Sequence, residues 1–121
     1  MYREMTKELE KWKGKAHRKP LLLTGVRQCG KTYIVNEFAG KYFKNYVYVN
    51  FESEEKLSGI FEYDFDVKRI VSELDKVFKA RIVPGETLVF FDEIQACPRA
   101  ITSLKYFCEN LRELHIVCAG S

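Results

Sequence analysis

The hydrophobic residues of this 121-residue chain follow two kinds of pattern. Four short runs have the apolar, β-branched and aromatic composition of buried strands: Leu21–Leu23, Tyr46–Phe51, Leu88–Phe91 and Ile116–Ala119. Between and before these runs, apolar residues recur every three or four positions, as in amphipathic helices. Helices are therefore expected from the N-terminus to near Gly14 and across Ile34–Tyr42, Val67–Phe78 and Arg99–Leu114.

Each expected helix has a set of apolar residues that is predicted to face the core. These sets are Tyr2, Met5, Leu9 and Trp12; Ile34, Val35, Phe38 and Tyr42; Val67, Ile70, Val71, Leu74, Val77 and Phe78; and Ile101, Leu104, Phe107 and Leu111. The segment Glu52–Asp66 predicts a short helix and an acidic loop, and Pro84-Gly85 predicts a turn before the third strand.

Strands that alternate with helices predict an α/β domain with a parallel sheet, helices on both faces and right-handed crossovers. One domain is expected over residues 1–121, with an amphipathic helix at 1–16 and an α/β core at 20–121. Ligands of such sheets bind at the carboxyl ends of the strands. Three polar clusters follow the first, third and fourth strands, and these are the candidate functional residues.

The first cluster, Gly25–Thr32 (GVRQCGKT), matches the phosphate-loop pattern G-x-x-x-x-G-K-[ST] between a strand and a helix. Glycines let successive N–H groups curl around phosphate oxygens, and the helix that follows adds the positive end of its dipole. Lys31 can reach the β- and γ-phosphates, and the Thr32 hydroxyl suits Mg²⁺. The candidate nucleotide-binding residues are Gly25, Val26, Arg27, Gln28, Cys29, Gly30, Lys31, Thr32 and Tyr33.

The second cluster is Asp92-Glu93, which follows four hydrophobic residues as in a Walker B strand. Asp92 is predicted to complete the magnesium site with Thr32, and Glu93 to act as general base on the water that attacks the γ-phosphate. Ser121 follows the fourth strand, which is expected beside the first, and is a candidate to hydrogen-bond that water or the γ-phosphate. The candidate catalytic residues are therefore Glu93, Lys31 and Ser121, the metal residues Thr32 and Asp92, and the cofactors ATP and Mg²⁺.

Composition narrows the class of protein. The net charge of +3 is too small to indicate nucleic acid by itself. Residues 1–20 carry seven Lys or Arg and three Glu, so a nucleic-acid contact stays open beside a solvated helix face. The four cysteines lack the spacing of a zinc site. The apolar runs are too short to cross a membrane, and the N-terminus lacks the apolar core of a signal peptide, so a cytoplasmic location is expected.

Four segments together resemble the predicted archaeal and bacterial AAA-type ATPases over about residues 17–121: RKPLLLTGVRQCGKT, YVYVNFE, TLVFFDEIQ and HIVCAGS. The resemblance implies a P-loop NTPase three-layer sandwich with strand order 1-4-3-2. It also implies Lys31 and Thr32 on phosphate and magnesium, Asp92 on magnesium, Glu93 on water, and Ser121 as the sensor after the fourth strand.

Members of that family continue into a fifth strand, a small helical lid and commonly a further C-terminal domain. The resemblance therefore implies that residues 1–121 are a truncated ATPase domain whose partner is that C-terminal domain. An arginine finger, worth roughly 10³- to 10⁵-fold in rate, would lie outside this chain. Without the fifth strand, the first strand would be an exposed edge, so self-association or marginal stability is expected.

Three functions are consistent with these motifs. The first is an ATPase domain that hydrolyses ATP in the intact protein and slowly or not at all as this chain. The second is a nucleotide-binding switch or interaction module without catalysis, which could contact DNA through its basic N-terminal helix. The third is a small-molecule kinase, which the adjacent acids Asp92-Glu93 favour less than water attack.

Overall fold

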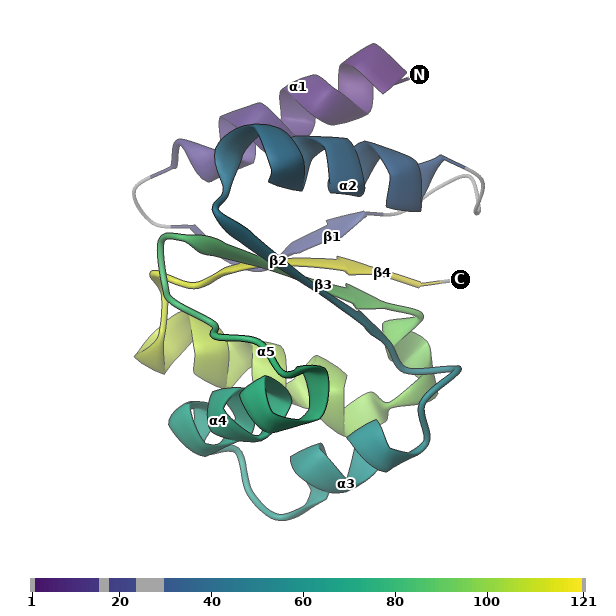
Figure 1. Ribbon diagram of the computed structural model, residues 1–121, viewed down its shortest axis with the longest axis vertical. Coiled ribbons are helices and arrows are strands. Elements are labelled where there is room, and N and C mark those ends of the chain that lie inside the picture. Colours follow the sequence, from purple (N-terminus) through teal and green to yellow (C-terminus); the bar gives the residue numbers. More distant parts are fainter. Residues whose placement is uncertain (1, 16–17, 24–29, 121) are drawn as a thin grey trace.

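A computed structural model describes residues 2–15, 18–23 and 30–120 as three layers, with a sheet between two layers of helices (Figure 1). The strands are β1 (Leu21–Leu23), β2 (Asn45–Asn50), β3 (Thr87–Asp92) and β4 (His115–Ala119). All strand pairs are parallel, and the order across the sheet is β1-β4-β3-β2. The predicted fold class and strand order are confirmed.

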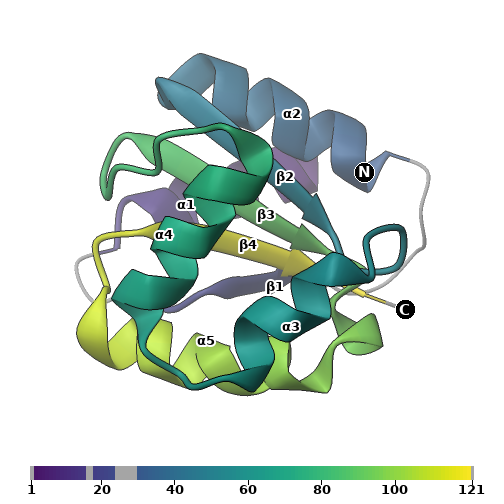
Figure 2. The same cartoon turned by 60° about the horizontal axis from the view of Figure 1, so that its bottom comes forward.

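Helices of the described residues cover both faces of the sheet (Figures 1 and 2). On the first face lie α1 (Tyr2–Lys13) and α2 (Lys31–Tyr42), and on the second lie α3 (Lys56–Glu62), α4 (Val67–Phe78) and α5 (Pro98–Asn110). A short 3₁₀ turn, η1 (Ile94–Ala96), joins β3 to α5. In the described ranges, no helix has the length and apolar character to span a membrane.

The central strand β3 is buried on both faces, as its uninterrupted apolar sequence predicts. Leu88 and Phe90 pack with the residues beneath α1 and α2, whereas Val89 and Phe91 pack with those beneath α3, α4 and α5. This strand therefore ties the two halves of the core together.

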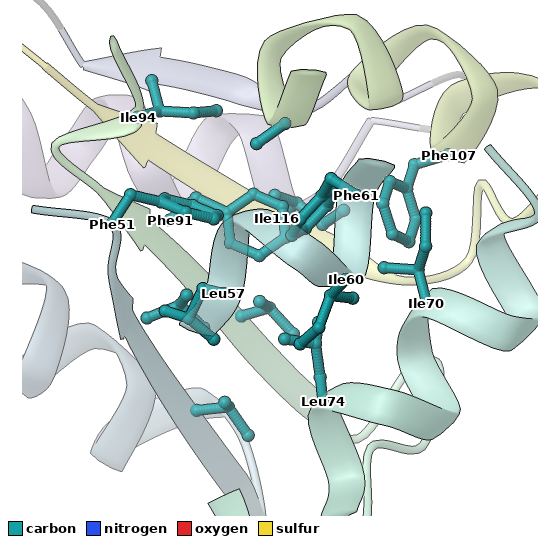
Figure 3. Close-up of a cluster of buried hydrophobic side chains, with 14 of the residues drawn as sticks. Phe51, Leu57, Ile60, Phe61, Ile70, Leu74, Phe91, Ile94, Phe107 and Ile116 are labelled. Atoms are coloured by element: carbon teal, nitrogen blue, oxygen red, sulfur yellow. The ribbon is translucent and has the colours of Figure 1, made fainter. Parts of the chain in front are cut away.

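Aromatic side chains form the centre of the core beneath α3 and α5 (Figure 3). The rings of Phe51 and Phe61 lie 5.3 and 5.9 Å from that of Phe91, and the Phe107 ring lies 6.3 Å away on a third side. All four rings meet edge to face, the geometry that aromatic quadrupoles favour. These contacts hold the carboxyl half of β3 against two helices.

Three residues that were predicted to face the core are exposed. Tyr42 lies in the last turn of α2, where its hydroxyl donates to Glu10 at 2.6 Å. Val77 lies in the last turn of α4, which ends at the left-handed residue Lys79. Ile101 is exposed because α5 turns a different stripe inward.

The inward stripe of α5 consists of Ala100, Ser103 and Phe107. The buried hydroxyl of Ser103 donates a hydrogen bond to the Ala100 carbonyl at 2.6 Å. Ser103 was not among the residues predicted to face the core, because that prediction considered only apolar residues. The helix also ends at Asn110, before the predicted end at Leu114, although Leu114 itself is buried.

The strand β1 lies at one edge of the described sheet, as predicted for the first strand. Its middle residue, Leu22, is 53% exposed. Self-association through this edge stays a prediction.

The imidazole of His115, at the start of β4, is buried between the rings of Trp12 and Phe43, whose centroids lie 5.4 and 5.0 Å away. Desolvation, together with the charges of Arg18 and Lys13, lowers its pKa from 6.5 to about 4. Its Nδ1 has no hydrogen-bond partner among the described residues. The fold therefore holds this side chain neutral.

Stability is expected to fall in acid because of His115. The unfolded chain binds a proton at this residue below about pH 6.5, and the folded chain binds it only near pH 4. Between pH 7 and 4 the free energy of unfolding should drop by about 3 kcal/mol more in the unaltered chain than in His115→Phe. Urea unfolding at the two pH values measures this difference, and equal pH dependence in both proteins would contradict the assignment.

Candidate functional site

The candidate residues meet at the carboxyl edge of the sheet. Parallel pairing places Asn50 of β2 opposite Asp92 of β3, and β4 ends beside them. Helix α2 begins on the same side of the molecule (Figure 1). The ends of three strands and the start of one helix therefore surround one region, as in other open α/β sheets.

The described part of the phosphate loop begins at Gly30. This residue has a φ of 123°, which favours glycine, and its carbonyl accepts the Ile34 N–H at 2.8 Å to open α2. Lys31 and Thr32 follow in the first turn of the helix, as the motif predicts. The predicted residues Gly25, Val26, Arg27, Gln28 and Cys29, and Ser121 after β4, lie outside the described residues.

Lys31 is only 9% exposed. No ion pair or hydrogen bond joins its ammonium group to another residue in the parts of the chain described. A buried cation needs an anionic partner, since desolvation without one is costly. Beside it, Tyr33 is 56% exposed and donates its hydroxyl to Glu37 at 3.0 Å.

The carboxylate of Asp92 is held by two donors. The Tyr48 hydroxyl donates to Oδ2 at 2.5 Å, and the Glu93 backbone N–H donates to Oδ1 at 2.9 Å. Asn50 in turn donates its Nδ2 to the Tyr48 oxygen at 3.2 Å, and its Oδ1 accepts the Glu52 N–H at 2.9 Å. Hydrogen bonds within the protein therefore fix the orientation of the Asp92 side chain.

Tyr48 also connects Asp92 to the phosphate loop. The pKa of Tyr48 is raised, first by desolvation and then by its hydrogen bond to Asp92, while hydrogen bonds from the side chains of Asn50 and Thr32 oppose the shift. The Thr32 side chain therefore lies close enough to the Tyr48 hydroxyl to influence its pKa.

Glu93 lies at a sharp turn of the chain. Its φ of 53° and ψ of 46° are left-handed, a conformation that non-glycine residues adopt at a cost of about 1 kcal/mol. Its carboxylate accepts the Nε2 of Gln95 at 2.7 Å. The carboxylates of Glu93 and Asp92 therefore have different hydrogen-bond partners, although the two residues are adjacent in sequence.

Sequence reasoning did not assign Tyr48, Asn50 or Gln95 to the site. The signal for the first two was present, because residues at period two share a face of a strand and the end of β2 lies at the binding edge. Gln95 follows a turn, where periodicity gives no information about direction.

The candidate metal ligands at this edge of the sheet fit Mg²⁺ better than Zn²⁺. Mg²⁺ prefers oxygen ligands and is held by one or two carboxylates with substrate phosphates and water, which the Thr32 hydroxyl and the Asp92 carboxylate match. Among the described residues, no three His, Cys, Asp or Glu gather as a metal-binding group. Cys97, Cys108 and Cys118 are free thiols, and burial raises the pKa of Cys118 to about 12.

Comparison with known proteins assigns the family. A search of curated proteins found no match. A family model described as an AAA domain matches residues 17–121, which include the phosphate loop, all four strands and the Asp92-Glu93 pair. On this match, the chain belongs to the AAA domain family, a family of P-loop ATPases.

Proposed function

We propose that this chain is an ATP- and magnesium-binding domain that hydrolyses ATP in the intact protein and only slowly by itself, with Glu93 polarising the attacking water. The observation that carries the proposal is the placement of Lys31. Its ammonium group is nearly buried at the start of a helix, without a counter-ion among the described residues, at the edge where Asp92 and Glu93 end β3. An anion is the ligand that such a group favours.

Lys31 and the start of α2 would bind the phosphates. The ammonium group is a compact donor suited to the β- and γ-phosphate oxygens, and the first N–H groups of α2 point toward the same region. Thr32 and Asp92 would hold Mg²⁺, which supplies positive charge to the phosphate oxygens as charge develops there.

Tyr48 would keep the Asp92 carboxylate oriented. Its hydroxyl donates to Oδ2, which would hold the carboxylate in one orientation toward Mg²⁺ or a water bound to it. Asp92 can therefore act without first rotating into place.

Glu93 would accept a proton from water. The water oxygen bonds to the γ-phosphorus as the bond from that phosphorus to the bridging oxygen of ADP breaks, giving ADP and inorganic phosphate. The left-handed turn sets the Glu93 carboxylate apart from Asp92, so one acid serves the metal and the other the water. In a longer protein, this cycle would drive movement of an attached domain.

The main alternative is a nucleotide-binding switch that does not hydrolyse ATP. The switch would use the same nucleotide-binding residues as the ATPase. The two differ only in whether Glu93 acts as a general base. Measuring binding and turnover in the same variants therefore separates the two functions.

The substitution Lys31→Ala should weaken binding of a fluorescent ATP analogue with Mg²⁺ by roughly 10- to 100-fold, because a charge-assisted hydrogen bond to phosphate is lost. Lys41→Ala is the matched control, since Lys41 lies near the other end of α2 and is exposed, 3.9 Å from Glu10. Equal affinity of the Lys31→Ala variant and the unaltered chain would refute the phosphate site.

The substitution Glu93→Gln should leave ATP affinity within about twofold and reduce single-turnover phosphate release by roughly 100-fold or more, as expected for loss of a general base. Glu109→Gln, on an exposed position of α5, removes the same charge away from the site. Unchanged phosphate release in Glu93→Gln would reject its catalytic role. Binding without any release from the unaltered chain would favour the switch.

Mg²⁺ should raise the ATP affinity of Tyr48→Phe about 10-fold less than it raises that of the unaltered chain. The reason is that Asp92 loses the hydrogen-bond donor that orients it. Tyr46→Phe is the matched control: the Tyr46 hydroxyl, two residues earlier on β2, is buried and has no hydrogen-bond partner in the described part of the chain. That control should bind Mg²⁺·ATP normally. Titrations with and without Mg²⁺ measure the effect, and equal Mg²⁺ dependence in both variants would contradict it.

A further inference from the structure

The side-chain amide of Gln95 lies between two parts of the candidate site. On one side its Nε2 donates to Glu93 Oε1 at 2.7 Å. On the other side its Oε1 lies against Gly120, the residue that follows β4. A Cβ atom at position 120 would lie only 2.5 Å from that oxygen, closer than real Cβ atoms approach a neighbour. A Cβ atom at position 120 would therefore displace the Gln95 amide from this place.

The turn that carries Gln95 also fixes the backbone of Glu93. The Ala96 N–H donates to the Glu93 carbonyl at 3.1 Å, which closes η1 around the left-handed residue. Figure 2 shows this turn, after β3, beside the end of β4. Backbone and side chain of Glu93 are thus both restrained by one short segment.

Packing alone does not explain this arrangement. Gln95 is exposed, so its side chain adds little to the hydrophobic core. Its polar atoms instead contact a carboxylate with a proposed chemical role and the end of the neighbouring strand. Such contacts are typical of residues that support a reacting group.

We infer that Gln95 is a positioning residue, which orients the Glu93 carboxylate toward the attacking water, and that Gly120 provides the space for its amide. The inference rests on the proposed function of Glu93. It adds that the end of β4 controls this carboxylate through Gln95, so displacement of residue 120 changes the rate of hydrolysis without changing nucleotide binding.

A double-mutant cycle tests the inference. Gln95→Ala and Gly120→Ala should each reduce the single-turnover rate of phosphate release by about 10-fold, with the ATP dissociation constant unchanged within twofold. The double variant should be no slower than Gln95→Ala, because removal of the amide leaves room for the methyl group at position 120. Asn110→Ala, an exposed amide at the end of α5, is the matched control and should keep the full rate.

Other results would overturn the positioning role. The first is a phosphate-release rate for Gln95→Ala within twofold of the unaltered chain. The second is a parallel loss of rate and ATP affinity in the single variants. The third is a loss of rate in the double variant equal to the combined losses of the two single variants. If Glu93→Gln lowers the rate while Gln95→Ala does not, this inference alone fails. If Glu93→Gln keeps the rate, or the unaltered chain releases no phosphate, the proposed function fails and the positioning role fails with it.

Nuclear magnetic resonance tests the contact independently of turnover. The side-chain amide protons of Gln95 should resonate away from those of a free glutamine in the unaltered chain, and return toward free values in Glu93→Ala and in Gly120→Ala. Free-amide shifts in the unaltered chain would overturn the inference whatever the rate of hydrolysis.

Discussion

The parallel pairing of β3 with β2 on one side and β4 on the other is the constraint on which the candidate site depends. Parallel strands in register end at one edge of a sheet, so pairing Asn50 with Asp92 fixes where the acidic residues lie. The pairing is itself held by burial of β3 on both faces, with Phe90 in one half of the core and Phe91 in the other. Core packing and site geometry therefore have the same origin.

Successive side chains of a strand point to opposite faces of the sheet, and this alternation decides which residues of β2 and β3 pack in the core and which reach the candidate site. On the α2 side of β2 and β3, Tyr48 packs beside Phe90 at 5.5 Å between ring centroids, yet its hydroxyl reaches Asp92. A tyrosine suits this place because its ring belongs to the core and its hydroxyl to the edge. Phenylalanine would fill the same volume without the donor.

The sequence predicted those parts of the fold that depend on period and length. Leu88–Phe91 reads as a strand buried on both faces and is one, and the order of the strands agrees as well. Prediction was wrong where a helix ends or turns a less apolar stripe inward, as at Val77 and Ile101. The inward stripe of α5 includes the small residues Ala100 and Ser103, and hydropathy alone does not rank these above isoleucine.

The candidate site was predictable to a similar extent. Lys31, Thr32 and Asp92 follow from motifs whose chemistry requires them, and the structure gives Asp92 a hydrogen-bond partner in Tyr48. The partner itself could not be identified, since its role depends on the register of β2 with β3. The contact of Gln95 with Glu93 depends on a left-handed backbone at a non-glycine residue, which no sequence rule anticipates.

The most direct test of this account is a crystal structure of the chain with Mn²⁺ in place of Mg²⁺ and a non-hydrolysable ATP analogue. Anomalous density for the metal is expected beside the Thr32 hydroxyl and the Asp92 carboxylate. The β- and γ-phosphates should contact Lys31, and Tyr48 should still donate to Asp92. Metal density elsewhere, or phosphates that do not contact Lys31, would contradict it.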